Sequence, residues 1–289
     1  MDASKNLPAP MFTTMSLSSV DFDIRTDAVF QDRIKPFIEK ELRELALFDQ
    51  DREIWAKENL SPDYVMTYRF ADHAKRVADD MHRTALHLGW GEAAAEALYW
   101  AMLPHDIGKR FLPVDIWDRM DKPNEALKTL RRSHVERGYE YVLNLPPPLY
   151  TPNDELNAMW NRMLGYKKII FPIFDGYKLL HPRDWLPYRY AIKKHPFMRL
   201  MRDIMLNHHE QMDGKGHRGV KGADLSPPVR LACIVESFDG YATARPHFGD
   251  RDISIEGVLN RMRTEKGADV FDMDLFEVFA ETKSKGYKG

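Results

Sequence analysis

Two pairs of neighbouring residues in this sequence carry side chains that bind metal ions. His105 and Asp106 follow the apolar run from Ala97 to Leu103, and His208 and His209 end a second helical segment. Neighbouring residues on a helix point about 100° apart, so such a pair suits two ions, or one ion beyond a helix end. Imidazole and carboxylate together bind iron, manganese or zinc. The two pairs therefore predict a dinuclear metal centre, with Asp106 as the bridging carboxylate.

Two other histidines lie where they would complete such a centre. His73 and His134 sit within amphipathic segments, and each would face inward together with its apolar neighbours. Five more histidines lie alone on their segments, where a histidine is more often a core or surface residue than a ligand. We expect no metal role for these five, which are His82, His87, His181, His195 and His247.

The composition excludes several classes of protein. Lys and Arg number 42 and Asp and Glu 44, a net charge of −2, so the chain as a whole does not attract polymeric nucleic acid or an anionic membrane. No apolar stretch approaches the roughly 18 residues of a membrane helix, and residues 1–21 lack the apolar region of a signal peptide. We therefore expect a cytoplasmic protein. Its single cysteine, Cys233, excludes an intrachain disulfide and a cysteine-based zinc site within one chain.

The segments that must position these groups show helical spacing of apolar residues. Between Ala28 and Leu60, for example, apolar residues follow one another at steps of three and four. Alternation typical of strands is nearly absent, so we expect an all-α helical bundle. Residues 1–25 are predicted to form a loose arm, and the Pro-containing stretch 146–194 an insertion of loop and short helix. Helices are predicted over 28–60, 63–88, 92–102, 128–143, 188–207 and 228–244.

Taken in order along the chain, these motifs resemble the HD-GYP branch of the HD superfamily of metal-dependent phosphohydrolases. The resemblance implies an all-helical HD domain that holds iron or manganese and, in most members, hydrolyses cyclic di-GMP or a related cyclic dinucleotide. It divides the chain into an arm and helical extension at 1–60 and a catalytic domain at 61–289. It rests on His73, the run His105-Asp106-Ile107-Gly108-Lys109, His134 with Gly138, the run from His208 to Gly216, and further matches to about Phe248.

Carried over position by position, the resemblance implies seven metal ligands. Six residues match family ligands, and Glu236 stands where the family usually has Asp. Where members with three metals carry a Glu, this chain has Arg69, a cation that would repel a third ion. We therefore expect two divalent ions, iron or manganese. The implied ligands are His73, His105, Asp106, His134, His208, His209 and Glu236.

The resemblance also implies a catalytic lysine, and two further carboxylates are expected to brace the site. Lys109 matches a lysine beside the scissile phosphate, so Lys109 and Asp106 are the expected catalytic residues. Asp213 and Asp239 are expected to support the site through hydrogen bonds to histidine or to loop backbone rather than to bind metal.

One loop and one later arginine are the predicted substrate contacts. In place of Gly-Tyr-Pro the chain has Gly216-His217-Arg218-Gly219, in a loop where cations and glycines favour an anion site formed by Arg218 and Lys221. Arg245 matches a family arginine that contacts phosphate, and its guanidinium fork suits that role.

These features predict a phosphodiesterase that opens a cyclic dinucleotide with a water activated by two metals. Two alternatives stay open at this point. Related HD sites use similar ligands to activate dioxygen, which would make the protein a di-iron oxygenase. The altered Gly-Tyr-Pro motif is also compatible with a catalytically weak module that senses nucleotides. A homodimer is compatible with the sequence.

Overall fold

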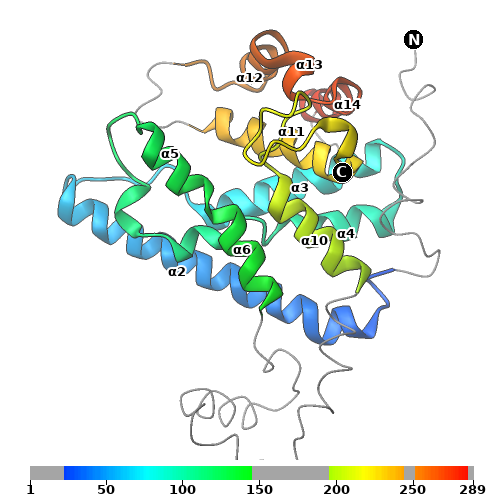
Figure 1. The fold of residues 1–289 in the computed structure, drawn as a ribbon, viewed down its shortest axis with the longest axis horizontal. Coiled ribbons are helices and arrows are strands. Elements are labelled where there is room, and N and C mark those ends of the chain that lie inside the picture. The colour runs from blue at the N-terminus through cyan, green and yellow to red at the C-terminus, as the bar shows by residue number, and fades with distance from the viewer. Residues whose placement is uncertain (1–22, 145–194, 244–250, 286–289) are drawn as a thin grey trace, which may run out of the picture.

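The computed structural model describes residues 23–144, 195–243 and 251–285, and within these ranges every regular element is a helix (Figure 1). The predicted all-α class is confirmed. The α-helices are α2 (Lys35–Asn59), α3 (Phe70–His87), α4 (Glu92–Met102), α5 (Glu125–Arg132), α6 (His134–Leu143), α10 (Pro196–Asn207), α11 (Pro227–Ala242), α12 (Ile255–Arg261), α13 (Gly267–Val270) and α14 (Met273–Ser284). Short π-helices are η2 (Phe30–Ile34) and η8 (Met262–Lys266), and short 3-10 helices are η3 (Ile107–Phe111), η4 (Val114–Ile116) and η6 (Gly222–Asp224).

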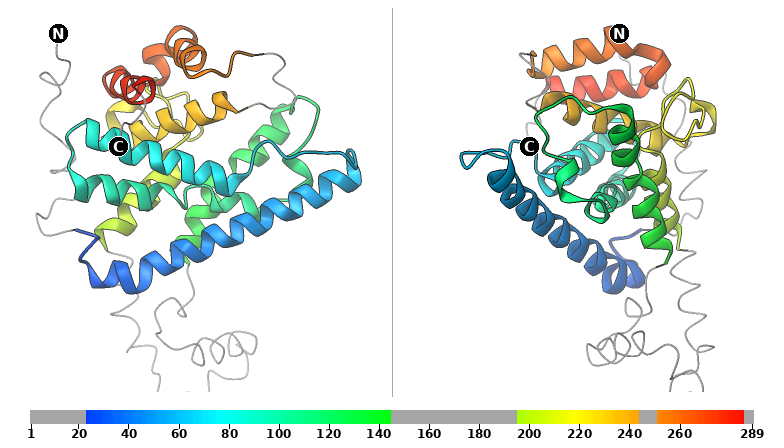
Figure 2. Two further views of the ribbon diagram at one scale, coloured as in Figure 1. Left: turned by 180° about the vertical axis from the view of Figure 1, so that it is seen from behind. Right: turned by 60° about the vertical axis from the view of Figure 1, so that its left-hand side comes forward.

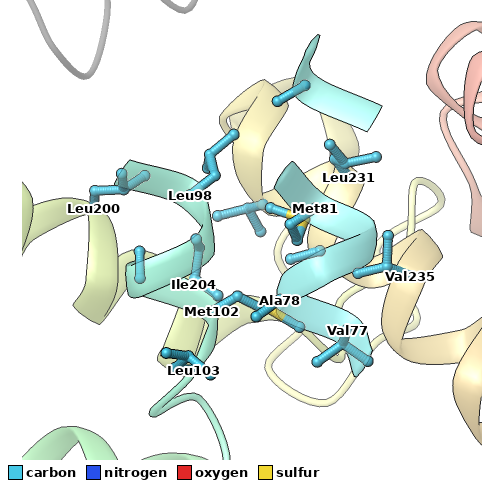
Figure 3. Close-up of a cluster of buried hydrophobic side chains, with 14 of the residues drawn as sticks. Val77, Ala78, Met81, Leu98, Met102, Leu103, Leu200, Ile204, Leu231 and Val235 are labelled. Carbon is cyan, nitrogen blue, oxygen red and sulfur yellow. The ribbon is translucent and has the colours of Figure 1, made fainter. Parts of the chain in front are cut away.

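Helix α3 lies at the centre of the bundle and packs against α2, α4, α11 and α14. Its buried stripe, which includes Val77, Ala78 and Met81, follows the three and four residue spacing of the sequence. Figure 3 shows these side chains meeting residues of α4, α10 and α11, such as Leu98, Ile204 and Val235. The core is therefore formed by helices from distant parts of the chain.

Helix α2 and the α12–α14 segment lie on opposite sides of α3 (Figure 2). The N-terminal part of α2 contributes Phe37 and Ile38 to the main core, and Leu45 packs in a second small cluster with Tyr68 and Phe70. The helical extension expected before residue 60 is thus packed into the same body as the rest of the bundle. The division at residue 60 stays a prediction.

Two of the differences between the predicted and the observed helices have a local cause. Helix α3 begins at Phe70 and not at residue 63, because Arg69 is extended and the Asp49 carboxylate of α2 accepts the backbone N–H of Phe70 and Ala71, both at 2.9 Å. The helix expected over 128–143 is divided into α5 and α6 at Ser133, whose hydroxyl donates back to the Leu130 carbonyl at 2.7 Å.

Other parts of the prediction fall where the structure gives no description. The arm up to residue 22, the insertion at 146–194 and the start of the helix expected from 188 lie outside the described residues. Among the described helices, none combines the length and the apolar character that crossing a membrane requires.

Candidate metal centre

The seven expected ligands come from five separate parts of the fold and meet in its interior. They form two groups, and within each group the ligand atoms lie within 4.8 Å of one another. All are buried except His209, which is partly buried. Their role as metal ligands stays a prediction. The first group is His73, His105, Asp106 and Glu236, and the second is His134, His208 and His209.

Local structure explains how these side chains reach the interior. His73 continues the buried stripe of α3, and Glu236 lies on the buried α11. His105 and Asp106 form the turn between α4 and η3, which packs closely against α6, where His134 is the first residue. The close approach depends on Gly108, because a Cβ atom there would overlap the backbone carbonyl of His134.

The carboxylate of Asp106 faces both groups. Its Oδ2 atom lies 3.4 Å from His73 Nε2 and 3.3 Å from His105 Nε2. Its Oδ1 atom lies 3.0 Å from His134 Nε2 and 3.9 Å from His208 Nε2. Each oxygen is therefore directed to a different group, which is the arrangement that a bridging carboxylate requires.

Hydrogen bonds on the outer side of the rings orient the imidazoles. The Nδ1 atoms of His105, His134 and His208 lie 2.8, 2.7 and 3.0 Å from the backbone carbonyls of Met102, Arg131 and Met205, so each Nδ1 carries the proton. Their Nε2 atoms consequently present lone pairs to the interior. This orientation is the one that a metal ligand needs.

Asp239 orients the fourth imidazole, that of His73. Its Oδ2 atom accepts from His73 Nδ1 at 2.7 Å, and Arg76 holds the same carboxylate through Nε at 2.6 Å and Nη2 at 2.9 Å. This places Asp239 behind the ring, between His73 and a partly exposed arginine. A carboxylate in that position fixes the ring and makes its Nε2 atom more basic.

The interior atoms fit a pair of cations. His73 and His105 direct their Nε2 atoms at each other at 3.3 Å, and His134 and His208 do so at 3.4 Å. The buried Asp106 Oδ1 and Glu236 Oε2 atoms have no hydrogen-bond partner among the described residues. Facing lone pairs and unpartnered carboxylate oxygens repel one another unless positive charge lies between them. Imidazole and carboxylate donors together suit divalent metal ions.

The electrostatics of the two groups differ. Burial lowers the pKa of His73 and His105, but Glu236 and Asp106 outweigh burial and raise the pKa of both rings. In the second group, burial and a neighbouring imidazole lower the pKa of His208, and burial lowers that of His209 to about 3, so both rings are neutral. The first group therefore carries the negative potential that attracts cations, and the second supplies neutral imidazoles.

Lys109 lies beside the same carboxylate. Its Nζ atom contacts Asp106 Oδ2 and lies 4.5 Å from the centre of the Phe70 ring, and the residue is only 6% exposed. Burial raises the pKa of Asp106, but the neighbouring Lys109 and His105 lower it by more, so the pKa lies well below its usual value. The contact with Lys109 therefore helps to keep Asp106 ionised.

A cavity of about 220 Å³ opens over the centre. His134, His209, Glu236 and Lys109 line it on the side of the ligand groups. The residue pattern did not predict the other walls, although the pair Arg131-Arg132 lies immediately before Ser133 and His134 in the sequence. These walls are formed by Arg52, Tyr64, Thr67, Tyr68, Phe70, Trp117, Asp118, Arg119, Arg131 and Arg132.

The two cationic side chains of the loop expected to bind anions do not line this cavity. Glu210 accepts the backbone N–H of Arg218 at 2.5 Å and of Val220 at 2.7 Å, and so holds the loop against the end of α10. The Arg218 side chain donates to Asn207 at 2.7 Å, and Lys221 is exposed. Neither residue lines the cavity. The arrangement thus gives their predicted substrate role no support.

The remaining predicted residues have separate positions. Asp213 accepts the backbone N–H of Lys215 at 2.9 Å and pairs with its ammonium at 2.9 Å, so it braces its own loop. Arg245 lies outside the described residues, as do His181 and His247. His195 belongs to neither ligand group and contacts Asp27 at 3.2 Å.

Comparison with known proteins agrees with this geometry. The HD domain family matches residues 70–277, which is more than half of the chain. The chain belongs to the HD domain family. HD domains bind divalent metals, and the two ligand groups provide this HD domain with side chains that could hold them.

One relative and one solved structure are similar to this HD domain chain. The "3'3'-cGAMP-specific phosphodiesterase 1" of Vibrio cholerae is 25% identical over 217 residues, which are 75% of this chain and 38% of the relative. The chain thus spans about two fifths of that protein. The solved structure of Bd1817, a HDG"Y"P protein from Bdellovibrio bacteriovorus, matches with a TM-score of 0.50 and 14% identity over 93% of this chain and 74% of that one. At this identity the match shows a shared fold.

Proposed function

We propose that this HD domain protein is a metal-dependent phosphodiesterase that hydrolyses a cyclic dinucleotide. The observation that carries the proposal is Asp106, whose two oxygens face two separate groups of inward-directed imidazole nitrogens beneath a cationic cavity. The relative from Vibrio cholerae, named for its action on a cyclic dinucleotide, supports the substrate class.

The donor set indicates which residues would hold the metals. The first group would hold one divalent ion and the second group the other, with Asp106 shared between them. A pair of divalent ions supplies an activated water and neutralises the charge on the non-bridging phosphate oxygens. In the absence of thiolate donors from these groups, iron or manganese suits the site.

The protein's own groups position and stabilise the reacting phosphate. Lys109 lies at the cavity surface beside Asp106, where its ammonium can approach a phosphate held over the centre. That charge stabilises the transition state as negative charge moves to the leaving oxygen. Asp239 and Arg76 keep the His73 ring in place, so the geometry is set before substrate binds. Opening one phosphodiester bond by addition of water converts the cyclic dinucleotide to a linear one.

The test combines metal analysis with a product assay. Protein loaded with Fe(II) without oxygen, or with Mn(II), is expected to hold two equivalents and to cleave at least one member of a panel of cyclic dinucleotides. Asp106→Ala is expected to lose both properties, because it removes the shared ligand. Asp224→Ala, which removes an exposed carboxylate outside the centre, is the matched control and should retain both.

Three outcomes would contradict the proposal. Metal-loaded protein that is inert toward every phosphodiester would refute it. Substrate-dependent oxygen uptake by the di-iron form would identify an oxygenase. Tight binding of a cyclic dinucleotide without turnover would identify a sensing module.

A further inference from the structure

The lining of the cavity is strongly cationic. Among the residues that line the cavity, five are Lys or Arg and two are Asp or Glu, although the whole chain has a net charge of −2. Of the two acids, Glu236 belongs to the ligand groups and Asp118 pairs with Arg52 at 2.7 Å. The cavity lining therefore has a local excess of positive charge, which favours an anionic ligand.

Most of these cations already have partners within the protein. Arg52 is buried between Asp49 and Asp118, and Lys109 contacts Asp106. Arg119 pairs with Asp121 at 3.0 Å. Each of these groups contributes charge to the cavity, but its hydrogen-bonding capacity is at least partly used.

The side chain of Arg131 is bound to the backbone of the neighbouring cavity wall. Its Nε atom donates to the Ile116 carbonyl at 2.8 Å and Nη2 donates to the Trp117 carbonyl at 3.1 Å. Its guanidinium also lies 5.9 Å from the centre of the Trp117 ring. Arg131 thus fastens α5 to the turn that carries Trp117, and holds that cavity wall in place.

Arg132 differs from its neighbours. It lines the cavity and is exposed, which places it at the rim, and no ion pair or hydrogen bond of its side chain is found among the described residues. Only Ser133 separates it from His134, and two residues of chain span at most about 7 Å. Arg131 and Ser133 fix the end of α5, so the backbone of Arg132 is held close to the second ligand group.

The size of the cavity suggests what Arg132 binds. Pockets that enclose a whole drug-sized ligand measure about 300–1,000 Å³. A cavity of about 220 Å³ is smaller, so it encloses only part of a dinucleotide. With one phosphate over the ligand groups, the second phosphate of a cyclic dinucleotide must lie nearer the rim.

We propose that Arg132 forms an anion subsite for the second phosphate of the substrate, the one that is not being cleaved. This inference rests on the proposed function and adds a substrate requirement to it: the preferred substrates carry a second phosphate. A guanidinium can donate two parallel hydrogen bonds to such a group. Arg132 would thus select dinucleotides over simple phosphodiesters.

The experiment compares two substrates in metal-loaded protein. Arg132→Gln is expected to raise KM for the cyclic dinucleotide at least about tenfold, in line with loss of a hydrogen bond between charged groups, and to leave kcat within about twofold. Hydrolysis of bis(4-nitrophenyl) phosphate, which has a single phosphate, is expected to be unchanged. Arg137→Gln removes an exposed arginine of α6 that does not line the cavity, and should behave as wild type.

Two results would overturn the inference. If Arg132→Gln changes neither substrate, the residue serves only the helix end, where a cation offsets the helix dipole. If it slows both substrates equally, it acts through the metal centre. Binding of the cyclic dinucleotide, measured in parallel by calorimetry, separates this inference from the proposed function.

The binding measurement distinguishes two further outcomes. Wild-type protein that binds the dinucleotide without cleaving it contradicts the proposed function, while weaker binding by Arg132→Gln would still support the subsite. Wild-type protein that neither binds nor cleaves it contradicts both.

Discussion

Replacement of Arg52 is expected to have a large effect on stability. The guanidinium is 2% exposed, and it donates to Asp49 at 2.6 Å and to the two oxygens of Asp118 at 2.7 and 2.8 Å. Asp49 in turn caps the first turn of α3 through the backbone N–H of Phe70 and Ala71. One buried cation therefore joins α2, the start of α3 and the turn that follows η4.

Arg52→Met fills most of the space of the arginine with an apolar side chain. It leaves Asp49 and Asp118, which are 1% and 9% exposed, without their counter-charge. Removing one partner from a buried ion pair costs about 3–5 kcal/mol. At about 2–4 °C for each kcal/mol, Tm should fall by roughly 6–20 °C. Differential scanning calorimetry, with urea unfolding as a second measure, tests this value.

Two further variants make the test specific to the stranded charges. Asp118→Asn in the Arg52→Met background removes one of these charges and should recover part of the loss. Lys57→Met removes the exposed partner of Glu53 on the same helix, a pair at 2.9 Å, and should cost less than about 1 kcal/mol. If Tm of Arg52→Met lies within about 2 °C of wild type, or if Asp118→Asn restores nothing, the reasoning is refuted.

Three further predictions concern the metal centre, helix packing and alkaline stability. Asp239→Asn should weaken metal binding by about 10–100-fold, measured by chelator competition, because the His73 ring loses an ionised partner; unchanged affinity would contradict this. Gly108→Ala should destabilise the fold much more than Gly138→Ala, since the first Cβ overlaps backbone and the nearest contact of the second is a Met side chain at 3.1 Å; thermal unfolding of the pair decides. Burial and Glu41 raise the pKa of Tyr141 from 10.0 to about 12, so the folded state holds this proton more tightly and stability should fall as pH rises from 10 to 12. In Tyr141→Phe the fall in stability should be smaller. The free energy of unfolding is measured with urea at several pH values, and the same decrease with pH in both proteins would disprove the prediction.

The helical character of the protein and the residue types of its candidate centre could be predicted from the sequence. Apolar spacing reveals helices because contacts at three and four residues lie within one element. The break at Ser133 and the late start of α3 were not predicted, because they depend on hydrogen bonds that the spacing does not show. In α3 the bond comes from Asp49 of another helix.

How the polar groups meet depends on the packing of the helices and could not be predicted from the sequence. From the sequence, Asp106 could be predicted as a bridge only because it is a carboxylate next to His105 and because the chain resembles a known family. In the structure, packing directs one oxygen of this carboxylate to each ligand group. Packing also ties the Arg218 backbone to Glu210, leaves its side chain out of the cavity lining, and brings Arg132 to the rim. The difference lies in the sequence separation of the contacts. Helix periodicity depends on residues three or four positions apart, whereas the site depends on contacts between elements far apart in the chain.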